Sequence, residues 1–140
     1  MKIYYYPEFD GRIRIYAVAS KCDGACVIYD YLSNLTCNNA DSIRIKIMQL
    51  ILRIAVDKLR NTQKFKPLNG TGSPTLYELK HKEHRLYGFF ADMGFLFLYC
   101  SGDKDKQKLD IKTAKRVRGE YLSDSSEANI HIKESLNGLH

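Results

Sequence analysis

The sequence predicts a single α+β domain, and three patterns in its 140 residues support this fold class. Short segments with strand-like alternation occur near the start and again in the second half of the chain. A long segment, residues 41–63, has helical spacing, and a shorter basic segment with helical spacing, residues 110–122, follows the later strands. This order predicts a helical hairpin packed on a small antiparallel sheet, with a short basic helix towards the C-terminus.

The N-terminal part is predicted to form two short strands and a helix. Residues 4–6 and 12–19 are rich in β-forming side chains and are separated by Pro7 and an Asp-Gly pair, which is typical of a hairpin. The second segment alternates apolar residues with Arg and Tyr, so one of its faces should be buried and the other solvated. Residues 23–35 carry apolar and aromatic side chains at four-residue spacing and predict a short helix.

The segment 41–63 gives the clearest helical signal, because Asn and Asp residues precede it as N-caps. Polar residues recur along it at steps of three and four. This polar stripe consists of Lys46, Gln49, Arg53, Asp57 and Arg60. Apolar side chains occupy most of the remaining circumference, so we expect the helix to be covered on more than one side.

The second half of the chain predicts a loop followed by three strands. Residues 65–74 contain two prolines and two glycines and are predicted to form the loop. The strands are expected at residues 76–82, 85–91 and 95–100, the last two joined by a tight Asp-Met-Gly turn. Residues 95–100 are apolar on both faces, which is typical of a central strand. A short alternating piece near the end, residues 129–133, could add to a sheet edge.

The chain has 22 basic and 16 acidic residues, and the positive excess lies in its middle. Residues 41–70 hold seven basic and two acidic side chains, whereas residues 1–40 are balanced. Such an excess favours polyanionic partners such as nucleic acid, or an acidic protein segment. No stretch predicts a membrane span or a signal peptide, so we expect a cytoplasmic protein without a membrane partner.

The cysteine and carboxylate patterns predict neither a metal site nor a cofactor. Cys22 and Cys26 have no second Cys/His pair that would complete a zinc site, and three carboxylates suited to Mg²⁺ are not evident. The four cysteines are too sparse for a disulfide scaffold, so we expect reduced and mostly buried thiols.

Three local motifs have the order and spacing of one known protein family. Residues 65–70, Phe-Lys-Pro-Leu-Asn-Gly, resemble its aromatic/basic-Pro-Leu-x-Gly loop, and residues 76–80, Leu-Tyr-Glu-Leu-Lys, resemble its Leu-Tyr-Glu-Leu-Arg strand. Residues 104–108 and 114–121 resemble its Lys-rich segment and its closing Ala-x-basic helix. Over residues 24–122 the chain therefore resembles the RelE/ParE/HigB superfamily of bacterial toxins, in particular the phage-derived HigB-like branch.

The resemblance implies a fold, an activity and partners. The fold would be one RelE-like toxin domain at residues 1–122, with residues 1–20 as an N-terminal strand extension and residues 123–140 as a tail. The activity would be that of a type II toxin, a metal-independent endonuclease (mRNA interferase) that cuts messenger RNA on the ribosome. The protein partner would be a cognate antitoxin of the helix-turn-helix type. Two alternatives stay open: inhibition of DNA gyrase in the ParE manner, and a non-catalytic relative that binds RNA or an antitoxin.

The resemblance also points to a catalytic centre, from which this chain departs in one place. Lys80 takes the position of the family's basic residue after Tyr-Glu-Leu and could act as a base if neighbouring cations depress its pKa. In the next strand the family has Tyr-Arg where this chain has Tyr87-Gly88. Arg85 lies three residues earlier and in an unbulged strand points to the opposite face, so it replaces that arginine only if the register or a bulge shifts it.

Further candidates lie around the strand connection and on the closing helix. Lys104 could assist at the phosphate, and Tyr121 could stack on a base or donate a proton, although it also falls on an apolar stripe where packing is the alternative. The residues expected to hold the RNA backbone are Lys82, Lys106, Lys108, Lys115, Arg116 and Arg118. Acidic residues are interleaved with the lysines of residues 103–110, and mixed charge of this kind is more often a solvated loop than a phosphate-binding site. His81 and His84 could supply an acid near neutral pH, whereas exposed hairpin histidines commonly have no role.

Overall fold

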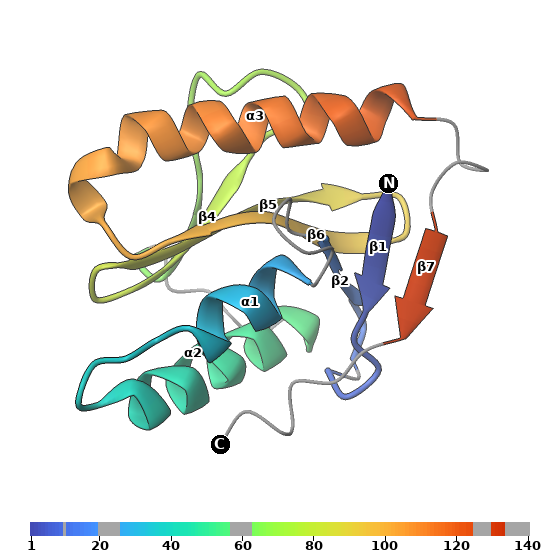
Figure 1. The fold of residues 1–140 in the computed structure, drawn as a ribbon. Helices are drawn as coiled ribbons and strands as arrows, with labels where there is room; N and C mark the ends of the chain where they lie inside the picture. Colours follow the sequence, from blue (N-terminus) through green and yellow to red (C-terminus); the bar gives the residue numbers. More distant parts are fainter. Residues whose placement is uncertain (10, 20–25, 57–62, 125–129, 134–140) are drawn as a thin grey trace.

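A computed structural model describes residues 1–9, 11–19, 26–56, 63–124 and 130–133 of the chain. The elements in these residues are β1 (Lys2–Tyr5), β2 (Ile15–Val18), α1 (Val27–Ser33), α2 (Ala40–Ala55), β3 (Phe65–Pro67), β4 (Tyr77–His81), β5 (His84–Ala91), β6 (Gly94–Ser101), the 3₁₀ turn η1 (Lys104–Lys106), α3 (Gln107–Ser123) and β7 (Ile130–Lys133). The strands form one sheet in the order β3-β4-β5-β6-β2-β1-β7. Helices α1 and α2 lie on one face of this sheet and α3 lies on the other (Figure 1). The α+β class predicted from the sequence is confirmed.

The sheet is antiparallel except at two pairs, β2 with β6 and β1 with β7. The prediction of an antiparallel sheet is therefore wrong at these pairs. The chain passes through both helices of the hairpin and three more strands between β2 and β6, and parallel neighbours need such a long crossover connection. The N-terminal hairpin is confirmed, since β1 pairs antiparallel with β2. The expected edge piece near the C-terminus is also confirmed, since β7 pairs with β1.

The second half of the chain follows the prediction for β4, β5 and β6, and departs from it at β3. Phe65, expected in a loop, pairs with Leu79 of β4, so residues 65–67 extend the sheet by one strand. A sequence with prolines can still form this strand because β3 is an edge strand, where one side of the backbone needs no partner in the sheet.

The helix predicted at residues 41–63 ends earlier, at Ala55. The backbone N–H of Ile13 donates to the carbonyl of Ala55 over 2.8 Å, which satisfies a carbonyl that the helix end leaves open. Gly11 lies so close that a Cβ built on it would be 2.4 Å from the same carbonyl oxygen, so this contact needs glycine. The last part of the predicted helix, residues 57–62, lies outside the described residues, as do residues 23–25 of the first predicted helix.

The two helices of the hairpin are tied together by Arg44 of α2. Its guanidinium donates to the carbonyls of Leu32 and Leu35, at 2.7 and 2.8 Å, and so satisfies backbone acceptors at and just after the end of α1. The same side chain forms an ion pair of 2.7 Å with Asp41 in the first turn of α2. One charged residue thereby fixes the connection between the helices.

Each face of the sheet buries its own apolar core. Along β6, Phe95 and Phe97 belong to the core under α1 and α2, whereas Leu96 and Leu98 belong to the core under α3, as expected for a central strand. Helix α2 was expected to be buried on more than one side, but part of its apolar surface is exposed, since Ile45 is 44% exposed. No helix in the described part of the chain is long and apolar enough to cross a membrane.

Candidate functional site

Lys80 of β4 and Arg85 of β5 are register partners beside the turn that joins the two strands. Facing residues of an antiparallel pair project to the same side of a sheet, so both side chains lie on the α3 face. Gly88 lies on the opposite face, as predicted, because it is three residues from Arg85 and successive residues of a strand point to alternate faces. The β-bulge in this region falls between the pairs of Tyr87 and Gly88 and leaves Lys80 and Arg85 in register. The structure therefore brings together the first two catalytic candidates.

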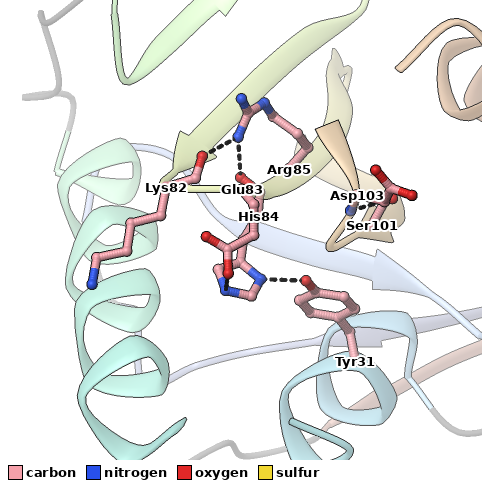
Figure 2. Close-up of polar contacts among 7 residues, drawn as sticks. All are labelled: Tyr31, Lys82, Glu83, His84, Arg85, Ser101 and Asp103. Carbon is pink, nitrogen blue, oxygen red and sulfur yellow. Dashed lines mark hydrogen bonds and ion pairs between the residues drawn. The ribbon is translucent and has the colours of Figure 1, made fainter. Parts of the chain in front are cut away.

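The two partners differ in what their side chains can do. Lys80 is exposed, whereas Arg85 is only 7% exposed. The Arg85 guanidinium donates to the carbonyl of Lys82, and to that of His84 over 3.0 Å, so it holds the turn between β4 and β5 (Figure 2). Its Nε lies 3.8 Å from a carboxylate oxygen of Glu78. The guanidinium of Arg85 therefore interacts mainly with the carbonyls of the turn and with Glu78.

Glu78 connects this strand pair to the start of α3. It is 2% exposed, and one of its oxygens accepts a hydrogen bond of 2.6 Å from the side-chain amide of Gln107. Burial raises the pKa of the Tyr87 hydroxyl, and the negative charges of Glu78 and Asp110 add to this effect. Asp110 is itself buried in the first turn of α3, where the helix dipole favours a negative charge. A buried polar layer thus underlies the exposed Lys80.

A basic residue not selected from the sequence lies on the same face. Lys66 of β3 is the register partner of Glu78, so it projects towards the α3 side, and it is exposed. The sequence contains this lysine inside the Phe-Lys-Pro motif. Its relation to Lys80 depends on the pairing of β3 with β4, which the predicted loop did not include.

The position of the missing arginine has no room for a side chain. A Cβ built on Gly88 would lie 2.5 Å from the carbonyl oxygen of Leu96 and 2.6 Å from the ring of Phe95. Both neighbours belong to the packed centre of the sheet. The arginine of the family motif is therefore replaced by a glycine that the packing of β5 against β6 requires.

The other predicted residues are spread over different parts of the molecule. Lys82 occupies the turn with a left-handed backbone, φ 53°, and not the strand face of Lys80. Tyr121 packs on Phe89, with ring centroids 5.8 Å apart, and it lies 14 residues along α3 from Gln107, or about 21 Å at 1.5 Å per residue. The packing alternative for Tyr121 is the one that the geometry favours.

The basic residues of α3 and η1 also differ in their freedom. Arg118 is buried and donates to the carbonyl of Pro74, and Arg116 forms an ion pair of 2.6 Å with Glu120. Arg116 is exposed despite this ion pair, and so are Lys106, Lys108 and Lys115. Lys104 begins η1, and its side chain lies outside what the structure describes.

A second group of titratable residues lies on the α1/α2 side of the same turn. Nδ1 of His84 is 2.5 Å from the hydroxyl of Tyr31 in α1, and its Nε2 is 3.4 Å from a carboxylate oxygen of Glu83 (Figure 2). His84 is 3% exposed, which corrects the expectation of exposed hairpin histidines. Burial lowers the pKa of His84; the carboxylate of Glu83 opposes this effect, and the nearby cations add to it. Tyr31 was missed because it lies 53 residues away in the sequence, with no local signal.

His81 lies beside this pair, at the end of β4 and opposite His84. Burial lowers the pKa of His81, and the positive charges of Lys64, Lys82, His84 and Lys46 lower it further.

Among the described residues no group of three or more His, Cys, Asp or Glu side chains could hold a metal ion. Comparisons with protein-family models, with curated proteins and with solved structures found no match for this chain.

Proposed function

We propose that this protein is the toxin of a type II toxin–antitoxin pair, a RelE-like, metal-independent endonuclease that cuts messenger RNA on the ribosome. The proposal rests on the motif resemblance. It is supported by the order of the elements: a helical hairpin, three antiparallel strands and a basic helix follow one another along the chain. The cytoplasm would be the place of action, and a cognate antitoxin would be the protein partner.

The observation that carries the proposal is the exposed Lys80 directly across from Arg85, with the exposed Lys66 on the same face. Cleavage of RNA by its own 2′-hydroxyl needs a base, and it needs positive charge around the pentavalent phosphorane. Lys80 would be the base. The neighbouring cations would stabilise the phosphorane. Lys106 and Lys108, near the start of α3, would hold the RNA backbone.

One observation favours a second candidate, a non-catalytic protein that binds RNA or an antitoxin. The guanidinium of Arg85 is bound to two turn carbonyls and lies close to Glu78, so it has few donors left for a phosphate. Because Gly88 offers no other arginine, transition-state stabilisation would depend on lysines alone. Such a protein would keep the basic surface that binds RNA or an antitoxin and would not cleave RNA.

The test is RNA cleavage by purified protein in the presence of translating ribosomes. Wild type should cut in EDTA and leave a 2′,3′-cyclic phosphate, and Lys80→Ala should slow the reaction at least about 100-fold, the low end for loss of a general base. Lys80→Arg should rescue poorly, because a guanidinium keeps its proton at working pH. Lys112→Ala, an equal loss of charge on exposed α3 surface, should cut at the wild-type rate.

Three outcomes separate the candidates. Growth arrest with loss of intact message supports the ribonuclease. RNA binding without cleavage or toxicity leaves the non-catalytic protein in its place. Arrest with double-strand DNA breaks and intact message identifies gyrase as the target.

A further inference from the structure

Strands β2 and β6 are parallel neighbours whose pairing ends at Ala17 and Phe97. The chain leads from β2 to α1 on one face of the sheet, and from β6 through η1 to α3 on the other face (Figure 1). Adjacent parallel strands whose connections leave towards opposite faces open a crevice at their carboxyl ends, and small ligands commonly bind in such a crevice. The topology therefore favours a ligand site just beyond this last pair, beside Val18 of β2 and Leu98 of β6.

A cavity of about 280 Å³ is present at this place. Val18 and Leu98 line it from the two strands. Val27 lines it from α1 and Val117 from α3, so helices from opposite faces of the sheet share one cavity. An apolar cavity of about 150 Å³ holds a benzene molecule, so this one has room for about twice as many heavy atoms, roughly a dozen.

The walls of the cavity are largely fixed before a ligand binds. Val18, Leu98 and Val117 are buried side chains of the sheet and of α3. On the α1 side Tyr31 lines the cavity, and its hydroxyl is 2.5 Å from Nδ1 of the buried His84, which anchors this wall (Figure 2). Side chains that are already ordered lose little entropy on binding, so a preformed cavity of this kind suits a small ligand.

The charges on the lining favour a cation. The charged side chains that line the cavity are Asp30 of α1 and Arg116 and Glu120 of α3. Arg116 and Glu120 form an ion pair of 2.6 Å with one another, and the amino group of Met1, which also borders the cavity, is paired with Asp124 at 3.3 Å. The carboxylate of Asp30 has no cationic partner among the described residues. It is therefore the charge in the lining that a ligand would neutralise.

An ammonium group suits this lining. A half-buried carboxylate accepts a charge-assisted hydrogen bond from such a donor, and the aromatic rings of Tyr31 and Tyr99, from the same lining, attract a cation as well. We propose that the cavity binds a small amine, with an apolar body of about a dozen heavy atoms and its ammonium group at Asp30. The site is separate from the proposed ribonuclease centre, because it lies on the β2 side of β6, whereas Lys80 lies in β4 on the other side.

The experiment is an NMR titration of the full chain with three indole derivatives that differ in charge: tryptamine, a cation, 3-ethylindole, which is neutral, and indole-3-propionate, an anion. The methyl groups of Val18, Leu98 and Val117 report on the cavity. Tryptamine should shift them with a dissociation constant of about 0.1–1 mM. 3-Ethylindole should bind about tenfold more weakly and indole-3-propionate more weakly still, because neither offers a cation to Asp30. No shift with tryptamine, or equal binding of all three, overturns the proposal.

Three variants locate the site. Asp30→Asn should weaken tryptamine about tenfold and change 3-ethylindole by about twofold or less. Asp105→Asn, the same substitution at an exposed position of η1, should bind both probes as wild type does. Val117→Phe fills the cavity and should abolish the binding of both. Undiminished tryptamine binding in Asp30→Asn, an equal loss in Asp105→Asn, or binding that persists in a folded Val117→Phe overturns the proposal. If Val117→Phe does not fold, the comparison of the two Asp→Asn variants decides alone.

Discussion

The two faces of the sheet bury different chemistry. Under α1 and α2 the core consists of aliphatic and aromatic side chains. Apart from cysteine and tyrosine, His84 is the titratable residue that this face buries in the described part of the chain. Its ring is hydrogen-bonded to Tyr31. Under α3 the buried residues include Glu78, Arg85 and Asp110. The stability of the first core depends on how well its side chains fill the space, whereas the stability of the second depends on whether each buried charge is paired or hydrogen-bonded.

This difference explains where a functional site can form. Polar groups on the α3 side hold one another in place, as the Gln107 amide and the Arg85 guanidinium hold the Glu78 carboxylate, and a polar layer of this kind can support an exposed residue such as Lys80. The apolar face offers no such layer except at the hairpin tip, where His84 and His81 lie. The Lys80–Arg85 pair and the Tyr31–His84 pair are therefore at the same end of the sheet, on opposite sides of the β4–β5 turn.

The largest effect should come from the apolar face. Phe95 is fully buried and packs against the rings of Phe65, Phe90 and Phe97 at centroid distances of 5.5, 4.9 and 4.9 Å. Phe95→Ala should lower the free energy of unfolding by about 3–5 kcal/mol, measured by urea denaturation. Leu109→Ala, at an exposed position of α3, should change it by about 0.5 kcal/mol or less. Similar losses in the two variants would contradict the assignment of Phe95 to the core.

On the α3 face the removal of one charge should cost nearly as much. Glu78→Ala leaves Arg85 buried without its carboxylate and Gln107 without its acceptor, so the free energy of unfolding should fall by about 3 kcal/mol. The control is Glu120→Ala, which breaks the exposed ion pair with Arg116 and should cost about 0–1 kcal/mol. If Glu78→Ala costs no more than Glu120→Ala, the buried layer does not depend on charge pairing.

The fold could be predicted from the sequence wherever a periodic pattern decided the structure. The apolar run in β6 predicted a central strand, and β6 does lie between β5 and β2 with a core on each side. The strand β3 could not be predicted, because Pro67 inside it and the glycines and Pro74 after it indicate a loop, and only its pairing with β4 makes it a strand. The end of α2 was also missed, since the group that caps it is the N–H of Ile13, from a distant part of the chain.

The candidate site could be predicted in part for the same reason. Strand alternation gives the face of Lys80, and the two-residue turn after His81 places Arg85 on that face. Whether Arg85 is free depends on its bonds to the turn carbonyls and on Glu78, which no spacing in the sequence reveals. The contact of Tyr31 with His84 joins a helix to a strand across the fold, so a local pattern cannot predict it.

A smaller effect tests the tight contact between β5 and β6. Gly88→Ala places a methyl group 2.5 Å from the carbonyl oxygen of Leu96, so we expect a loss of about 1–3 kcal/mol in the free energy of unfolding. Gly119→Ala is the matched control, because nothing lies within 4 Å of the added methyl group on α3. It should stabilise the protein by about 0.5–1 kcal/mol, since alanine favours a helix over glycine. Opposite signs for the same substitution are the expected result.

The smallest effect concerns the histidine buried on the apolar face. Burial lowers the pKa of His84 below the 6.5 of an exposed histidine, Glu83 opposes this, and Arg85 and Lys82 add to it. The unfolded chain therefore binds the proton more readily than the folded one, and stability that is fully present above about pH 6.5 should decline as the pH falls below that value. The slope for one histidine cannot exceed about 1.4 kcal/mol per pH unit. Urea denaturation between pH 8 and 5 should show this decline.

His84→Asn should reduce the slope of the free energy of unfolding against pH, because the group that titrates is removed. Tyr31→Phe should lower stability by about 1 kcal/mol at pH 8 and keep this slope, because only a hydrogen bond is lost.

The sign of the slope decides between two descriptions of this face. If Glu83, 3.4 Å from Nε2, formed a strong ion pair with His84, protonation would be favoured in the folded state and stability would rise as the pH falls below 6.5. Burial outweighs this partner because Glu83 is exposed to solvent, which screens its charge, while the His84 ring is enclosed by the protein. A slope that rises towards acid pH would mean that the α1/α2 face, like the α3 face, buries a paired charge.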